Sequence, residues 1–156
     1  MKLATLCYVI DKKKNSTLML HRVKKKNDYH EGKWNGLGGK FLPGETPEEC
    51  AIREIKEESG LEVKSLTLRG FISFPLFDKK EDWYVFLFTA DRFKGKLIDS
   101  LEGILEWIPN EKLFDLNLWD GDKIFMKWLF QDKYNFFSAK FIYENGKFIK
   151  HDVIFY

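Results

Sequence analysis

Residues 39–61 read GKFLPGETPEECAIREIKEESGL, a loop followed by the clearest helix signal of the chain. Thr46 is a good N-cap, a proline takes the first helical position, and Glu49 stands three residues after the cap. Together they form a capping box. Gly60 is placed to end the helix in a left-handed conformation. The pattern therefore predicts a helix over residues 47–59.

Three carboxylates crowd one face of this predicted helix. At about 100° per residue, Glu54, Glu57 and Glu58 fall within an arc of about 100°. Like charges so close repel one another, so the arrangement gains stability when a cation sits among them. Hard divalent cations, Mg²⁺ above all, take oxygen ligands and bridge to substrate phosphates. A solvated acidic face is the alternative for the helix taken alone.

The loop before the helix favours the metal site. Gly38 and Gly39 allow a tight backbone path beside the helix start, and Glu45 adds a fourth carboxylate just before the N-cap. Arg53 is placed to pair with Glu45, and its planar fork suits a bidentate pair.

The same stretch has the spacing of a known signature. The fixed positions are Gly39, Glu45, Arg53, Glu54, Ile55, Glu57, Glu58, Gly60 and Leu61. This pattern resembles the signature of the Nudix hydrolases at every fixed position. The resemblance implies an α/β/α sandwich with a central mixed sheet, in which the signature forms a loop–helix–loop. It also implies an enzyme that hydrolyses a nucleoside diphosphate linked to a further group.

The resemblance assigns metal ligands. It implies that Glu57 and Glu58 bind the ion most directly and that Gly39 lends its backbone carbonyl. Glu54 is either a further ligand or the group that orients the water. The expected ion is Mg²⁺, with Mn²⁺ as a possible substitute. The bound ion would neutralise phosphate oxygens and lower the pKa of a water that attacks phosphorus in line.

Supporting residues follow from the same resemblance. Arg53 and Glu45 would hold the catalytic helix and its loop in place. Enzymes of this kind often recruit one more acid from outside the signature, and Glu102 is the best candidate here. An ordinary loop acid is the alternative for Glu102.

A second resemblance bears on the substrate. Residues 33–40, KWNGLGGK, are similar to the stretch before the signature in the MutT-type oxidised purine nucleoside triphosphatases, particularly the animal enzyme. Residues 118–122, LWDGD, and the closing segments around an Asn-Gly pair are similar too. The likeness covers nearly the whole chain, weakly outside the signature and residues 33–40.

This likeness implies a base pocket. Asn35 and Asp122 would hydrogen-bond the purine edge, and Trp119 would stack on its face, because an amide offers a donor and an acceptor together and rings stack on bases. Other residues expected at the substrate are Tyr29, Thr5, Phe74 and Lys40.

The chain departs from the family in one place. In the MutT-type family, a proline follows the tryptophan and two adjacent acids follow the proline. Here Asp120 stands where the proline was, and Gly121 replaces one acid. Asp120 either substitutes for that acid in the pocket or caps the following helix. The departure leaves the oxidised-base preference open.

Three functional hypotheses result. The first is a sanitising triphosphatase that converts 8-oxo-dGTP or a similar purine triphosphate to the monophosphate plus pyrophosphate. The second is a Nudix hydrolase for another substrate, such as an ordinary nucleoside triphosphate, a dinucleoside polyphosphate, a nucleotide sugar or a capped RNA end. The third is a non-catalytic module that senses a nucleotide.

The rest of the chain predicts one α/β or α+β domain over residues 1–156. Strands are expected at residues 3–10, 17–23, 62–76, 82–90, 104–108, 135–143 and 147–155, and a second helix from Asp120 or Gly121 to about residue 131. Residues 27–39 read as loop. Strands outnumber helices, which favours a layered domain with a mixed sheet.

Composition narrows the class of protein. The net charge of +2 argues against stable nucleic-acid binding. Cys7 and Cys50 make no disulfide framework, and no leader or membrane span is expected. We therefore expect a cytoplasmic monomer or weak dimer without membrane contact. The lysine run at residues 24–26 reads as a solvated turn or as a source of one phosphate contact.

Overall fold

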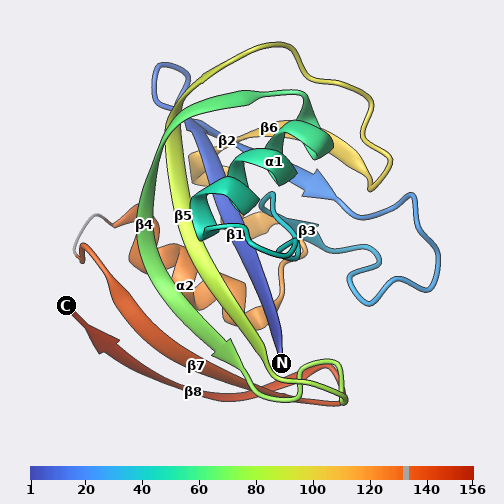
Figure 1. Cartoon of the computed structure of the whole chain (residues 1–156), viewed down its shortest axis with the longest axis vertical. Helices are drawn as coiled ribbons and strands as arrows, with labels where there is room; N and C mark the ends of the chain where they lie inside the picture. Colours follow the sequence, from blue (N-terminus) through green and yellow to red (C-terminus); the bar gives the residue numbers. More distant parts are fainter. Residues whose placement is uncertain (132–133) are drawn as a thin grey trace.

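The computed structural model describes residues 1–131 and 134–156. Eight strands in this part of the chain form one sheet (Figure 1). They are β1 (Lys2–Asp11), β2 (Ser16–His21), β3 (Trp34–Asn35), β4 (Glu62–Phe74), β5 (Trp83–Lys94), β6 (Ile104–Pro109), β7 (Phe137–Glu144) and β8 (Lys147–Phe155). Their order is β3-β2-β1-β5-β4-β7-β8, and β6 pairs with β2. β1–β5 and β4–β7 are parallel and the other pairs antiparallel, which confirms the predicted mixed sheet.

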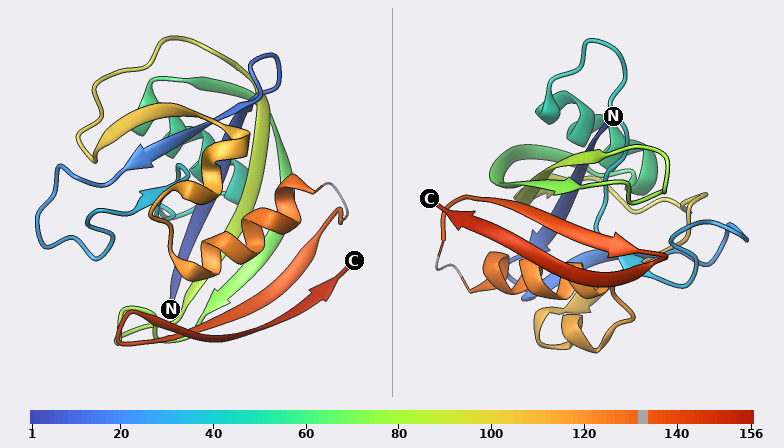
Figure 2. Two further views of the ribbon diagram at one scale, coloured as in Figure 1. Left: turned by 180° about the vertical axis from the view of Figure 1, so that it is seen from behind. Right: turned by 90° about the horizontal axis from the view of Figure 1, so that it is seen from below.

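Helices cover both faces of this sheet (Figures 1 and 2). They are α1 (Pro47–Ser59), α2 (Asp120–Phe130) and a short 3₁₀ helix at Asn110–Asp115. Alternate residues of a strand point to opposite faces. Tyr8 of β1 accordingly lies in the core with Phe125 of α2, whereas Cys7 and Val9 lie in the core with Ile55 of α1. The expected α/β/α sandwich is confirmed.

The start and end of α1 agree with the prediction. The Glu49 N–H donates to Thr46 Oγ1 at 3.1 Å, and the Thr46 N–H donates to Glu49 Oε2 at 3.0 Å. Gly60 has φ 83°, the left-handed conformation expected of the C-cap. Local signals thus define both ends of the helix that carries the acids.

Several strand ends differ from the prediction. β5 continues to Lys94 instead of ending at residue 90, because Phe93 and Lys94 pair with the start of β4. β2 ends at His21, and part of the predicted loop forms β3 because Trp34 and Asn35 pair with β2. These pairings join segments far apart in sequence, which local patterns do not reveal.

No helix of the described residues has the length and apolar character needed to cross a membrane.

The capping box yields a stability prediction. Thr46→Ala leaves the Glu49 N–H without its side-chain acceptor, so we expect the free energy of unfolding to fall by about 1 kcal/mol. Thr46→Ser keeps a hydroxyl and should lose less than about 0.5 kcal/mol. Urea denaturation followed by tryptophan fluorescence measures both variants. Equal losses in the two variants would contradict the capping role.

Candidate active site

A cavity of about 1030 Å³ is lined by the acidic face of α1 and by a group of aromatic rings. Small-molecule sites span about 300–1,000 Å³, so a nucleotide fits this volume. Most of the metal and substrate residues predicted from sequence line it, namely Thr5, Tyr29, Asn35, Gly39, Lys40, Glu54, Glu57, Glu58, Phe74, Glu102, Trp119 and Asp122. The fold therefore brings together residues from both ends of the chain.

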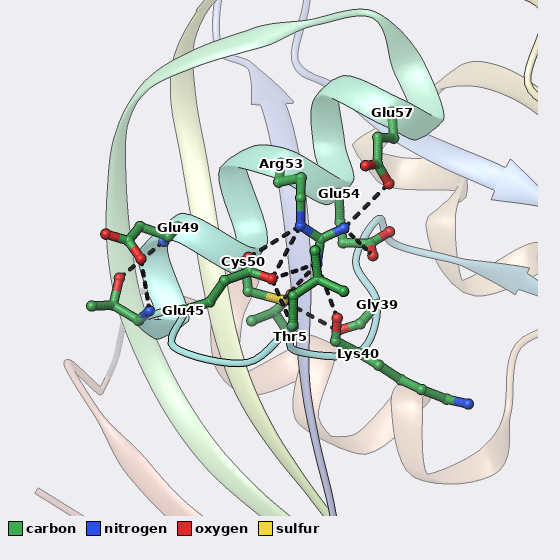
Figure 3. A network of polar contacts seen from close by, with 11 residues as sticks. Thr5, Gly39, Lys40, Glu45, Glu49, Cys50, Arg53, Glu54 and Glu57 are labelled. Atoms are coloured by element: carbon green, nitrogen blue, oxygen red, sulfur yellow. Dashed lines mark hydrogen bonds and ion pairs between the residues drawn. The ribbon is translucent and has the colours of Figure 1, made fainter.

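Arg53 ties the signature loop to α1 (Figure 3). Its Nε and Nη2 donate to Glu45 Oε1 at 3.1 and 2.8 Å, and Nε also lies 3.1 Å from Oε2. Nη2 further donates to the Lys40 carbonyl at 3.0 Å. The Arg53 hydrogen bonds hold the pKa of Glu45 below its usual value. The pairing of Arg53 with Glu45 predicted from sequence is present, and it fixes the loop path.

Arg53 also holds two of the α1 acids (Figure 3). Its Nη1 donates to Glu54 Oε1 at 2.8 Å and to Glu57 Oε2 at 3.2 Å. Gly39 lies so close to the Glu54 carboxylate that a Cβ at this position would overlap it. The glycine therefore lets the loop backbone approach the acids.

Glu58 is the buried member of the acidic group. It accepts a hydrogen bond from the Gly38 N–H at 2.8 Å. Burial raises the pKa of Glu58 to about 8, the Gly38 hydrogen bond opposes this rise, and the charges of Glu54 and Glu102 add to it. A carboxyl group with this pKa is largely protonated at neutral pH, and a nearby cation would favour its ionised form.

The chemistry of these donors fits a divalent ion such as Mg²⁺. Mg²⁺ takes oxygen ligands and commonly uses one or two carboxylates, with water and phosphate oxygens completing its shell. The Glu57 side chain is 60% exposed and can turn toward an ion. The Gly39 carbonyl accepts the Thr5 N–H at 2.9 Å and a weaker contact from the Cys50 thiol at 3.5 Å, which an ion at this oxygen would replace. Among the described residues no three acidic, histidine or cysteine side chains are grouped closely enough to hold an ion together, so joint ligation by the α1 acids stays a prediction.

Glu102 lines this cavity and pairs with two positively charged side chains. It lies 2.9 Å from Lys25 Nζ and 3.5 Å from Arg22 Nη2. Arg22 and Lys25 line the cavity as well. The lysine run at residues 24–26 gave a signal for Lys25, whereas nothing in the sequence singled out Arg22. Because both positively charged side chains line the cavity, they can attract the phosphates of a ligand bound there.

Trp119 is held rigidly at the aromatic part of the cavity. Its Nε1–H donates to His30 Nδ1 at 2.8 Å, and burial, with the Arg22 charge, lowers the pKa of His30 to about 4, which keeps this acceptor neutral. Tyr29 stacks on Trp119 with centroids 5.7 Å apart, and Phe77 meets it edge-on at 5.3 Å. These contacts fix the plane of the indole.

Two polar groups among these rings have no partner. Asn35 Oδ1 is buried and forms no hydrogen bond with any described residue. Asp122 is buried, and the described residues give its carboxyl group no hydrogen bond or ion pair. Burial raises the pKa of Asp122 to about 7, and the Lys33 charge opposes the rise. Unpaired polar groups inside a protein are costly, so these two are candidates for binding a ligand.

Asp120 is not brought to the cavity. Its side chain is 67% exposed and lies 3.9 Å from Lys123. α2 begins at Asp120, so the preceding Trp119 is its N-cap and Asp120 forms no side-chain cap. Neither alternative for Asp120 describes its position in the structure. The aromatic residues Phe77 and Tyr143 line the cavity instead, and sequence reasoning missed both.

The raised pKa of Asp122 yields a prediction about stability and pH. The folded state holds this proton up to about pH 7, whereas the unfolded state loses it near the usual pKa of 3.8. Stability should therefore fall as pH rises between these values and then level off. Asp122→Asn removes this decline, so its melting temperature relative to wild type should rise between pH 5 and pH 8.

Asp120→Asn is the matched control, because its carboxylate is exposed. Thermal unfolding in EDTA across this pH range should give Asp120→Asn the wild-type profile. A pH profile of Asp122→Asn parallel to that of wild type would contradict the buried, protonated carboxyl.

Comparison with known proteins agrees with this geometry. The NUDIX domain family matches residues 1–129. The Oxidized purine nucleoside triphosphate hydrolase of Danio rerio is 38% identical over 130 residues, which cover 83% of this chain and 79% of that protein. The Mus musculus protein of the same name is 38% identical over 109 residues, 70% of each chain.

Solved structures have the same fold. The crystal structure of the Mutator MutT protein from Bacillus halodurans is 28% identical to this chain and superposes with a TM-score of 0.86. The match covers 98% of this chain and 97% of the other. The family match spans the cavity residues up to α2 and includes the whole signature loop and helix. This chain therefore belongs to the Nudix family of hydrolases.

Proposed function

We propose that this Nudix hydrolase uses Mg²⁺ to convert oxidised purine nucleoside triphosphates, such as 8-oxo-dGTP, to the monophosphate and pyrophosphate. One observation carries the proposal: a single cavity is lined both by Glu57 and Glu58 and by Trp119, Asn35 and Asp122. A nucleotide with its phosphates at the acids can therefore place its base among the rings. The names of the Danio rerio and Mus musculus relatives favour the same substrate class.

The acidic group would hold the reacting phosphates in place. Nudix hydrolases use divalent metals, and a bound ion supplies charge neutralisation at phosphate oxygens and lowers the pKa of water. Glu57 and Glu58 would hold that ion, while Glu54 positions the water or binds the ion as well. Lys25 and Arg22 pair with Glu102 and lie at the cavity, where they can attract the negative triphosphate.

The rings and unpaired polar groups would select the base. Trp119 offers a fixed stacking plane, worth about 1–3 kcal/mol per base. The Asn35 amide presents a donor and an acceptor. Asp122, with its pKa of about 7, can meet either a donor or an acceptor on the base edge. Such groups distinguish an oxidised purine, whose pattern of donors and acceptors differs from that of the normal base. The reaction would remove oxidised nucleotides from the cytoplasmic pool before DNA synthesis.

A second substrate class has its own support. The ADP-ribose pyrophosphatase of Methanocaldococcus jannaschii is 33% identical over 114 residues, 68% of this chain and 64% of that protein. The absence of an acid at position 121 also removes one base contact expected from the family. ADP-ribose therefore belongs in any substrate panel.

A substrate panel tests the proposed function. Purified protein is given 8-oxo-dGTP, dGTP and ADP-ribose with Mg²⁺ or with EDTA, and the products are separated by anion-exchange chromatography. We expect kcat/KM for 8-oxo-dGTP to exceed that for dGTP by at least about tenfold, because the oxidised base adds an N7–H donor and a C8 carbonyl with which the site's polar groups can pair. EDTA should abolish turnover. Equal rates on the two triphosphates, or preference for ADP-ribose, would overturn the substrate assignment.

Two variants on α1 test the assignment of the acids. Glu57→Gln keeps the shape of the side chain but removes its charge, so kcat should fall by at least about 100-fold, as expected for losing several kcal/mol of charge stabilisation. Glu48→Gln, an exposed acid of the same helix that does not line the cavity, should keep wild-type kcat. A fully active Glu57→Gln enzyme would remove Glu57 from the metal site.

A further inference from the structure

Tyr143 of β7 lies against position 121, where the family resemblance places the first of two adjacent acids and this chain has a glycine. Gly121 stands at that position near the start of α2, and a Cβ there would lie 2.6 Å from Tyr143 Oη and 2.9 Å from a ring carbon of Phe141. Such contacts are closer than packed atoms allow. Any side chain at position 121 would therefore displace Tyr143. The observed position of the Tyr143 ring thus requires a glycine at 121.

The Tyr143 hydroxyl has a donor to spare. Its oxygen accepts the Gly121 N–H at 2.7 Å, which satisfies one of the free N–H groups at the start of α2. A phenol carries one O–H donor. No acceptor for that O–H is found among the residues that the structure describes. The Tyr143 proton is thus available to a ligand.

Tyr143 also lies among the residues proposed to hold the base. It lines the cavity, its ring meets Trp119 edge-on at 5.6 Å, and it meets Phe77 at 5.1 Å. The charge of Asp122 contributes to the raised pKa of Tyr143, although burial is the larger cause. The hydroxyl therefore stays protonated and remains a donor at neutral pH.

The direction of a bound nucleotide follows from the position of the acids. Trp119 and Tyr143 belong to the core on the α2 face of the sheet, whereas Ile55 of the acidic helix belongs to the core on the other face. The sugar joins a purine through its five-membered ring. With the phosphates at α1, as proposed above, the six-membered ring of the purine and its C6 substituent would extend away from the acids, into the part of the cavity that Tyr143 lines.

We propose, on the basis of the function proposed above, that the Tyr143 hydroxyl is a specificity-determining donor that favours purines with a carbonyl at C6 over purines with an amino group there. A carbonyl oxygen accepts the Tyr143 hydrogen bond. An amino group presents a donor instead, and the Tyr143 oxygen, which already accepts the Gly121 N–H, is a poor acceptor for it. Sites built on such hydrogen bonds discriminate strongly against the unmatched partner.

Tyr143→Phe tests this proposal, because it removes the hydroxyl and keeps the ring. We expect wild type to prefer 8-oxo-dGTP over 8-oxo-dATP and the ratio of their kcat/KM values to fall by about tenfold in the variant, through a loss for 8-oxo-dGTP. Tyr84→Phe is the matched control; Tyr84 stacks on Phe71 and does not line the cavity, so the ratio should stay at the wild-type value.

A merely structural role for Tyr143 gives a different result. Loss of the Gly121 contact alone would lower the melting temperature or reduce kcat/KM for both nucleotides equally, and an unchanged ratio would overturn the proposal. If wild type hydrolyses neither nucleotide, the proposed function fails, and calorimetric binding of 8-oxo-dGMP and 8-oxo-dAMP then tests Tyr143 separately. The proposal expects the preference for 8-oxo-dGMP to shrink in Tyr143→Phe. It is overturned if that preference is unchanged or if neither monophosphate binds wild type.

Discussion

Repulsion among the carboxylates on one face of α1 is the constraint on which the site depends. The protein's own side chains relieve this repulsion in two ways. Arg53 spreads its guanidinium over Glu45, Glu54 and Glu57. Glu58 is buried, and its pKa of about 8 lets it give up its charge. Both devices let the acids stand on one helix face at little electrostatic cost, and Glu57 would turn from Arg53 toward a divalent ion that arrives with a nucleotide.

The sheet connects this acidic group to the aromatic part of the cavity. β1 runs between the two helical layers, and its Thr5 lines the cavity while its N–H holds the Gly39 carbonyl. Glycines at 38 and 39 bring the loop backbone against both the strand and the acids. Trp119, locked by His30, completes the other side. The acidic group and the aromatic part of the cavity thus rest on separate layers that share one strand.

The sequence predicted well those features that depend on neighbouring residues. The bounds of α1, its capping box and the Arg53–Glu45 pair all follow from short-range signals, and the Asn-Gly turn between β7 and β8 has the positive φ values that its residues favour. Features that depend on distant pairings were missed. Tyr143 lies 22 residues from the Gly121 N–H that it accepts. Neither residue alone signals the contact. Asp120 was expected to line the pocket or to cap α2, and in the structure its side chain is exposed and does neither.

The central claim is that the α1 acids gather a divalent ion onto the phosphates of a nucleotide whose base lies at Trp119. The most direct measurement is the anomalous scattering of Mn²⁺ in crystals grown with a non-hydrolysable α,β-imido analogue of 8-oxo-dGTP. The account predicts an anomalous peak within ligand distance of Glu57 and Glu58, with phosphate oxygens completing its shell. A peak elsewhere, or acids still paired with Arg53 while the nucleotide is bound, would contradict it.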